Sequence, residues 1–126
     1  MTSMTAARAL AQLLEAYGTT DIFMVPAVLR RTMAELEAYP HIRRIHVHGE
    51  KAAAYMADGY ARTAGRPGIC MAQVIGAMNL AAGLRDAWLA HSPVVALTGG
   101  SDPATKYRKV YQEVDDMPAF ERVTKF

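Results

Sequence analysis

The chain alternates between segments with helical periodicity and short segments that are almost wholly apolar. Four segments show the helical spacing of apolar residues, at 5–18, 29–39, 50–64 and 76–89. In the first of them Thr5 can act as the N-cap and Gly18 can end the helix. Its inner face is expected to comprise Leu10, Leu13, Leu14 and Tyr17.

The apolar segments between these helices predict four strands, at 21–25, 42–47, 68–72 and 93–98. The last strand shows no polar alternation, so we expect it to be covered on both faces. Strands that alternate with helices at this spacing predict an α/β fold, in which a central parallel sheet lies between helices in a three-layer αβα arrangement. After Gly99 the chain is polar and irregular, with a short helix predicted at 118–123.

Composition predicts one globular domain, because 52% of the 126 residues are hydrophobic and 21% are charged. Fourteen basic residues face twelve acidic ones, and the largest basic group, Lys106, Arg108 and Lys109, is too small to predict a nucleic-acid partner. No apolar run is long enough to span a membrane. Cys70 is the only cysteine and lies in a predicted strand, so we expect a buried thiol, no internal disulfide and a cytoplasmic location.

The residue with the clearest chemical potential is Glu50, which begins a predicted helix directly after the strand at 42–47. Ligands of parallel α/β sheets bind outside the carboxyl ends of the strands, where this acid is expected. Alanines at 53, 54 and 57 would hold its helix against the core. Two interpretations are open on these residues: a first-turn glutamate favoured by the helix dipole, or a partly buried acid that takes part in proton transfer.

The passage at 48–62 has the pattern H-x-E-x-A-A-x-Y-M-A-D-G-Y-A-R. It resembles the pyrimidine-binding domain of thiamine-diphosphate enzymes of the acetolactate synthase and pyruvate decarboxylase type. Further pieces that resemble this family follow the same order along the chain, at 21–26, 66–70, 76–87, 93–99, 111–113 and 123–126. The resemblance therefore covers nearly all of residues 1–126, as a single pyrimidine-binding domain.

The resemblance implies thiamine diphosphate as the cofactor, bound here through its aminopyrimidine end, and a 2-oxo acid as the substrate. In this family a glutamate hydrogen-bonds to N1′ of the aminopyrimidine, which makes Glu50 the expected catalytic residue. Pro26, Gly76 and Asn79 would join Glu50 in binding the cofactor, and Gln112 matches a glutamine that faces the substrate. For Asn79 the alternative is a side chain bonded to its own helix, and for Gln112 a solvated loop residue.

The chain departs from the family at two glycine-rich turns. Met24 and Val25 before the proline, and Ala27 and Val28 after it, stand where the family has small residues, and 73–75 replaces a serine-glycine-proline turn. Because glycines near a ligand permit close backbone approach, bulkier residues here would narrow the pocket.

The family's G-D-G…N motif, which holds the diphosphate and Mg²⁺, does not occur in this sequence. The diphosphate-binding domain is therefore expected in cis or on a separate subunit, with no metal site in this chain and a homodimer as the assembly. The family's final helix and strand are also absent, so we expect a truncated domain with a sheet incomplete at its C-terminal end. The alternative function is a non-catalytic interaction or regulatory module. A third interpretation, a hydrolase with Ser101 as its nucleophile, is disfavoured because Ser101 does not lie in a G-x-S-x-G turn.

Overall fold

A computed structural model describes residues 3–26 and 29–125 of the chain. The α-helices are Ala6–Ala16 (α1), Arg30–Glu35 (α2), Glu50–Ala64 (α3) and Val74–Leu89 (α4). The strands are Asp21–Met24 (β1), Arg43–His46 (β2), Gly68–Ala72 (β3) and Val94–Thr98 (β4). Short 3-10 turns occur at Leu36–Ala38, Pro103–Thr105 and Met117–Ala119.

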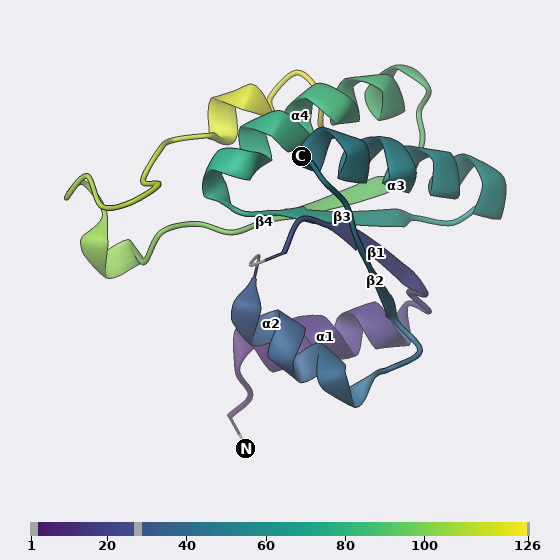
Figure 1. The fold of residues 1–126 in the computed structure, drawn as a ribbon, viewed down its shortest axis with the longest axis horizontal. Coiled ribbons are helices and arrows are strands. Elements are labelled where there is room, and N and C mark those ends of the chain that lie inside the picture. Colours follow the sequence, from purple (N-terminus) through teal and green to yellow (C-terminus); the bar gives the residue numbers. More distant parts are fainter. Residues whose placement is uncertain (1–2, 27–28, 126) are drawn as a thin grey trace.

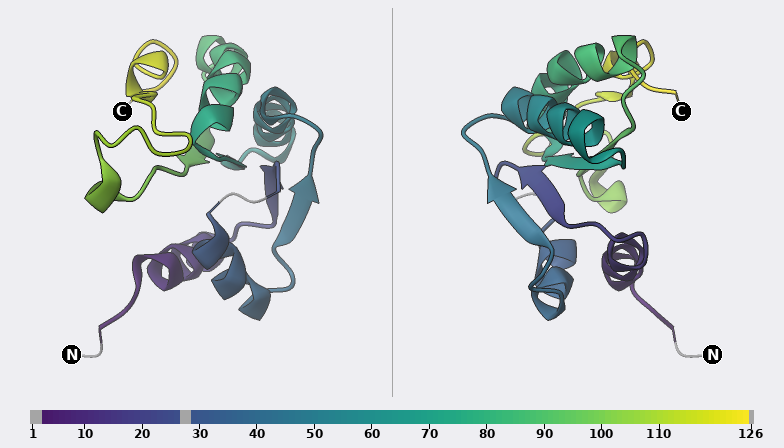
Figure 2. Two further views of the ribbon diagram at one scale, coloured as in Figure 1. Left: turned by 60° about the vertical axis from the view of Figure 1, so that its left-hand side comes forward. Right: turned by 90° about the vertical axis from the view of Figure 1, so that its right-hand side faces the viewer.

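The four strands form one parallel sheet in the order β2-β1-β3-β4. Helices α1 and α2 lie on one face of the sheet, and α3 and α4 lie on the other (Figures 1 and 2). The buried apolar side chains form two clusters, one on each face, with Leu36 and Ile42 in the first and Leu80 and Leu84 in the second. The expected three-layer αβα fold is confirmed. None of the described helices has the length and apolar composition needed to cross a membrane.

The order of strands creates a switch point between β1 and β3, which are hydrogen-bonded neighbours. From β1 the chain continues into α2 on one face, whereas from β3 it continues into α4 on the opposite face (Figure 1). The connections that leave the two strands therefore diverge, and ligands in open parallel sheets bind where this happens. The fold thus indicates the carboxyl ends of β1 and β3 as the place for a site.

Helix α3 packs unusually close to its neighbours because glycine occurs at the contacts. A Cβ atom added to Gly68 of β3 would lie 2.7 Å from the carbonyl carbon of Ala57 in α3. A Cβ atom added to Gly83 of α4 would lie 2.7 Å from the Cβ of Ala54. The predicted end of α3 is also confirmed, because Gly65 caps it with φ of 64°, in the left-handed region that favours glycine. The position of α3 is therefore fixed by contacts that exclude any side chain.

Two predicted helix details differ in the structure. Helix α4 begins at Val74 rather than Gly76, since the Ala77 amide already donates to the Gln73 carbonyl at 2.7 Å. Leu13 and Tyr17 are exposed rather than on the inner face of α1. Tyr17 is the C-cap residue and has left the helical turn, and Leu13 lies beside the buried stripe of Ala11 and Leu14.

The expectation that the strand at 93–98 is covered on both faces is wrong, because Val95 and Thr98 of β4 are exposed. Strand β4 pairs only with β3 in the described chain and so lies at an edge of the sheet. The side chain of Val95 is 43% exposed, whereas all five residues of β3 are buried. The short helix predicted at 118–123 is found only as a 3-10 helix at Met117–Ala119. Apolar content predicted a strand correctly, but strand order decides which strand lies at an edge.

The backbone contact at Gly68 should make this position intolerant of any side chain. Gly68→Ala is expected to lower the free energy of unfolding by about 1–3 kcal/mol, because neither the strand nor the helix backbone can move aside. Gly59→Ala is the matched control, since Gly59 is an exposed α3 residue whose added Cβ would meet nothing within 4 Å. That control should stabilise the chain by about 0.5–1 kcal/mol. Urea unfolding of both variants tests this, and equal effects would contradict the packing.

Asp58 should contribute a pH-dependent part of the stability. Its buried carboxylate accepts two hydrogen bonds from Arg62, at 2.9 and 2.7 Å, and this guanidinium lowers the pKa of Asp58 below its ordinary value. A carboxyl whose pKa is lower in the folded chain stabilises it above the pKa of the unfolded chain, about 3.9, and loses this contribution as the pH falls through the folded-state pKa. Asp58→Asn should therefore destabilise the chain at neutral pH and progressively less below about pH 4. Unfolding curves across this range test it, with the exposed Asp115→Asn as a control that should show no such convergence.

Candidate functional site

Glu50 is the first residue of α3 and follows the N-cap residue Gly49, just beyond the carboxyl end of β2. Gly49 has an extended backbone and offers no side chain to cap the helix. The first-turn amide groups of α3 have no helical acceptor, so the positive end of the helix dipole faces the carboxylate. The Glu50 side chain is half-buried. The sequence therefore placed this acid at the correct edge of the sheet.

The carboxylate of Glu50 lies against the beginning of α4. The side-chain amide of Asn79 donates a hydrogen bond from Nδ2 to Oε2 of Glu50 at 3.2 Å, across 29 residues of sequence. A Cβ atom added to Gly76 would lie 2.8 Å from Cδ of Glu50. The structure thus brings together three of the predicted site residues, Glu50, Gly76 and Asn79. Asn79 bonds to Glu50 and makes no side-chain hydrogen bond to its own helix.

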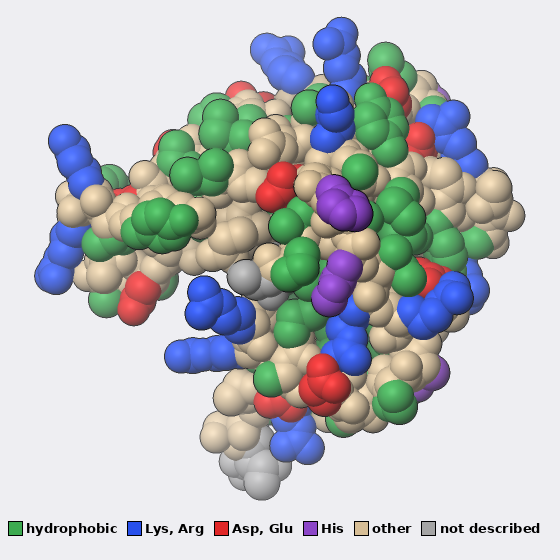
Figure 3. All heavy atoms as spheres, viewed as in Figure 1, with side chains coloured by type: hydrophobic (Ala, Val, Ile, Leu, Met, Phe, Trp, Pro, Cys, Tyr) green, Lys and Arg blue, Asp and Glu red, His purple; other side chains and the backbone are tan. Residues whose placement is uncertain are grey.

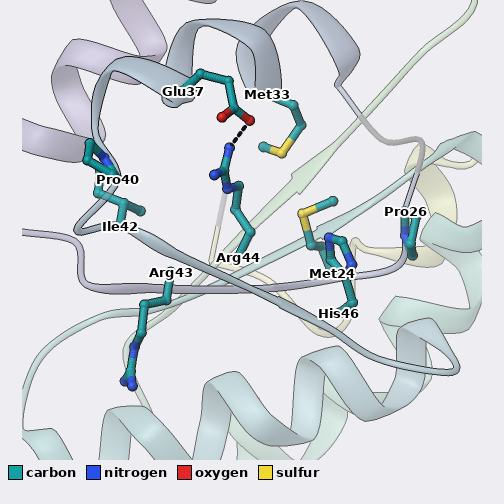
Figure 4. A pocket seen from close by; sticks show the side chains of 9 residues that line it. All are labelled: Met24, Pro26, Met33, Glu37, Pro40, Ile42, Arg43, Arg44 and His46. Carbon is teal, nitrogen blue, oxygen red and sulfur yellow. Dashed lines mark hydrogen bonds and ion pairs between the residues drawn. The ribbon is translucent and has the colours of Figure 1, made fainter.

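Pro26 lies on the other side of the switch point. It follows β1 and lines a groove of about 510 Å³ on the α2 side of the sheet. Figure 4 shows this groove, where the Met24 and Met33 side chains lie at the apolar part and Arg44 points to Glu37. Glu50 does not line the groove. Glu50, Gly76 and Asn79 form the Glu50 cluster, and Pro26 lines a groove that does not include these residues. Ala27 and Val28 lie outside the described residues.

Gln112 belongs to the segment that extends beyond the carboxyl end of β4 (Figure 1). Its backbone has φ of 61°, its Nε2 donates to the Tyr111 hydroxyl at 3.1 Å, and its side chain is half-buried. The carboxylate of Glu113 holds this segment by accepting the amide hydrogens of Tyr107 and of Val110, the latter at 3.0 Å. Lysine and arginine side chains project from the tip of the segment (Figure 3). No contact in the described chain joins Gln112 to Glu50.

A residue that the sequence analysis did not select is Gln73, the N-cap residue of α4. A Cβ atom added to Gly99 would lie 2.8 Å from Oε1 of Gln73, so this amide lies between the carboxyl ends of β3 and β4. The signal in the sequence was a polar residue directly after a buried strand, the same signal that indicated Glu50. Ser101, considered for a hydrolase, makes no hydrogen bond to a histidine within the described chain.

The structure contains further groups that bear on the chemistry of this edge. Within residues 3–26 and 29–125, no three histidine, cysteine, aspartate or glutamate side chains cluster in a way that could hold a metal ion. Cys70 is buried in β3, and burial raises the pKa of its thiol to about 12. A thiol with this pKa is not a nucleophile at neutral pH. Glu50, by contrast, is an ionisable group at this edge whose carboxylate links α3 to α4 through its hydrogen bond with Asn79.

Comparison with known proteins gives one consistent result. Residues 4–119 match the family model described as "Thiamine pyrophosphate enzyme, N-terminal TPP binding domain". The chain is 34% identical over 124 residues to sulfoacetaldehyde acetyltransferase of Alcaligenes xylosoxydans xylosoxydans. This match covers 98% of this chain and 21% of that protein. It is 34% identical over 123 residues to the probable acetolactate synthase large subunit of Methanocaldococcus jannaschii, covering 97% of this chain and 21% of that protein.

The fold agrees with a solved structure, the thiamine diphosphate-dependent 4-hydroxybenzoylformate decarboxylase of Rhodococcus jostii RHA1. The TM-score is 0.84 at 26% sequence identity, over 97% of this chain and 23% of that chain. The chain thus spans about a fifth of the length of the curated relatives that it matches. From the matched sequence and the shared fold, the chain belongs to the family of N-terminal TPP binding domains of thiamine pyrophosphate enzymes.

Proposed function

We propose that the chain is the pyrimidine-binding half of a thiamine-diphosphate-dependent enzyme that acts on 2-oxo acids, as a decarboxylase or an acetolactate-synthase-like enzyme, with Glu50 as its catalytic residue. The observation that supports this most directly is the placement of the Glu50 carboxylate. It is half-buried at the carboxyl edge of the sheet and is held against α4 by Asn79. A first-turn glutamate with only a helix-stabilising role would need no contact with a second helix.

The residues around Glu50 fit the aminopyrimidine end of the cofactor. Oε2 is bonded to Asn79, and Oε1 has no hydrogen-bond partner within the described chain, so one carboxyl oxygen is available for one ring nitrogen. Gly76 has no side chain, and the Glu50 carboxylate lies in the space that a Cβ atom would occupy. The described residues contain no cluster of metal ligands. As the resemblance to the family implies, Mg²⁺ and the diphosphate would be held by a separate domain, in cis or on another subunit.

When bound, the cofactor supplies an electron sink for carbanion chemistry at the carbonyl carbon of the substrate. The role of Glu50 is to share a proton with N1′ of the aminopyrimidine. Its half-buried position limits access of water to that proton. Pro26 would bound the ring from the β1 side, and Gln112 would face the substrate from the segment after β4. Asn79 would join Glu50 in binding the cofactor at the same edge.

We further propose a homodimer in the cytoplasm. The length of the relatives, about five times that of this chain, supports a diphosphate-binding partner domain. A single cysteine, buried as a free thiol, is consistent with a reducing compartment.

The second candidate is a non-catalytic interaction or regulatory module, and one observation favours it. Met24 is 3% exposed and lines the groove beside Pro26, at a position where the resemblance leads us to expect a small residue. A methionine here would occupy space on the β1 side of the switch point. Cofactor binding distinguishes the two candidates, because a module without catalytic function has no need to retain it.

Glu50→Gln tests the proposed catalytic role. In the enzyme assembled with its diphosphate-binding domain, exchange of the C2 proton of bound thiamine diphosphate should slow by about 10²–10⁴-fold, the typical contribution of a positioned acid or base. Deuterium exchange followed by rapid quenching and NMR measures this rate. Glu121→Gln, at an exposed residue after the last 3-10 turn, is the control and should leave the rate unchanged. An unchanged rate in Glu50→Gln would exclude Glu50 as the proton-transfer group.

Calorimetric titration tests the division of the cofactor site between two domains. Thiamine diphosphate with Mg²⁺ should bind weakly or undetectably to this chain alone, because the described residues offer neither a metal site nor a diphosphate motif. Binding should become strong when a diphosphate-binding domain is added as a separate chain. Tight binding to the chain alone would contradict the split site, and no binding in the mixture would favour the non-catalytic module.

A further inference from the structure

We infer that Asn79 is a positioning residue for Glu50. By its hydrogen bond, Asn79 determines which carboxyl oxygen of Glu50 holds the shared proton, and it acts through Glu50 rather than on the cofactor directly. The inference rests on the proposed role of Glu50. It changes the role of Asn79 from that of a cofactor ligand to that of a partner of the catalytic acid.

The chemistry of the two side chains fixes the direction of the hydrogen bond. Nδ2 of Asn79 lies 3.2 Å from Oε2 of Glu50 and can only donate. Oε2 must therefore accept, and a carbonyl oxygen accepts more strongly than the hydroxyl oxygen of the same carboxyl. The bond to Asn79 thus favours placing the proton of a protonated Glu50 carboxyl on Oε1. Oε1 has no hydrogen-bond partner within the described chain and lies against Gly76, so it is the oxygen left to bond a ring nitrogen.

Gly76 restricts the same carboxyl from a second direction. A Cβ atom at this position would lie 2.8 Å from both Cγ and Cδ of Glu50. The glutamate side chain thus lies in the space that any other residue would fill. Asn79 and Gly76 are on adjacent turns of α4, so a single helix provides both the hydrogen bond and the wall.

The packing of α3 on α4 keeps this arrangement constant. Gly83 lies one turn beyond Asn79, and a Cβ atom there would meet the carbonyl oxygen of Lys51 at 2.7 Å. Lys51 directly follows Glu50, so the backbone next to the acid is held against α4 as well. The N-cap residue Gly49 provides no side-chain hydrogen bond. Within the described chain, Asn79 is therefore the side chain that orients the carboxylate of Glu50.

The hydrogen bond can be observed in the chain without any cofactor. Asn79 is the only asparagine in the sequence, so selective labelling of asparagine with ¹⁵N gives a single side-chain amide signal. Glu50→Gln replaces the charged acceptor and should shift the proton resonances of this amide, and Glu50→Ala should make its two protons more alike. Glu121→Gln is the control and should leave the signal in place. An amide signal that does not respond to either Glu50 variant would overturn the inference.

A double-mutant cycle tests whether Asn79 acts through Glu50. In the enzyme assembled with its diphosphate-binding domain, Asn79→Ala should slow C2-proton exchange by about 10–100-fold, the loss expected for one hydrogen bond to a charged group. Asn79→Asp should slow it further, because this isosteric change places a like charge beside Glu50. Asn79→Ser, which retains a donor, should restore part of the rate. In the Glu50→Gln background Asn79→Ala should cause little further loss, because residues that act through one another are not additive.

Each outcome of the cycle has a distinct meaning. If Asn79→Ala and Glu50→Gln reduce the rate independently, Asn79 contacts the cofactor by itself and the inference is wrong, although the proposed function stands. If Glu50→Gln has no effect on exchange, the proposed function fails, and the amide signal still reports whether the contact exists. Asn79 is exposed, so its variants should remain folded at the temperature of the assay, and this is checked by circular dichroism.

Discussion

The structure depends on the close approach of α3 to β3 and α4 at three glycines. Gly68 faces the backbone of Ala57, Gly83 faces Ala54 and the backbone of Lys51, and Gly76 faces the side chain of Glu50. The contacts at Gly68 and Gly83 involve backbone atoms, which cannot adjust by a change of rotamer, so they hold α3 at one position along β3 and α4. Because Glu50 is the first residue of α3, its distance from the first turns of α4 is then fixed as well.

The topology explains why the candidate site is divided between the two faces of the sheet. Helix α3 leaves β2 at one edge and crosses β1 to reach β3, so it brings an acid from an outer strand toward the switch point. The connection after β1 leads to α2 on the opposite face, and Pro26 goes with it. The Glu50 cluster and the groove beside Pro26 are therefore separate features of the structure, on the two sides of one divergence.

The two edges of the sheet differ in a way that matters for the isolated chain. Strand β2 is short and begins with two arginines, each paired with an acid, Arg43 with Asp21 and Arg44 with Glu37. Short, charged edge strands resist pairing with other chains. Strand β4 is apolar and borders a groove of about 890 Å³, lined among others by Trp88, Val95 and Phe120. An apolar edge strand of this type is prone to pair with another strand.

Much of the fold could be predicted from local sequence, because helices and buried strands record their environment in the spacing of apolar residues. The four helices, the four strands and the stop at Gly65 follow from that record, and the position of Glu50 follows from the general rule for parallel sheets. The start of α4 was less visible, since first-turn residues such as Val74 need no helical hydrogen bond from their own amide groups. The exposure of β4 was not visible at all, because strand order is a property of the whole sheet.

The sequence by itself determined the α/β class, the acid at the carboxyl end of β2 and the family to which the chain belongs. Only the tertiary structure decided that Asn79 bonds to Glu50, that Gly76 is a glycine because that carboxyl lies against it, and that Pro26 lines a different groove. The physical reason is that these contacts join segments far apart in the sequence. They are set by how closely two helices pack, and a linear pattern of residues does not contain that distance.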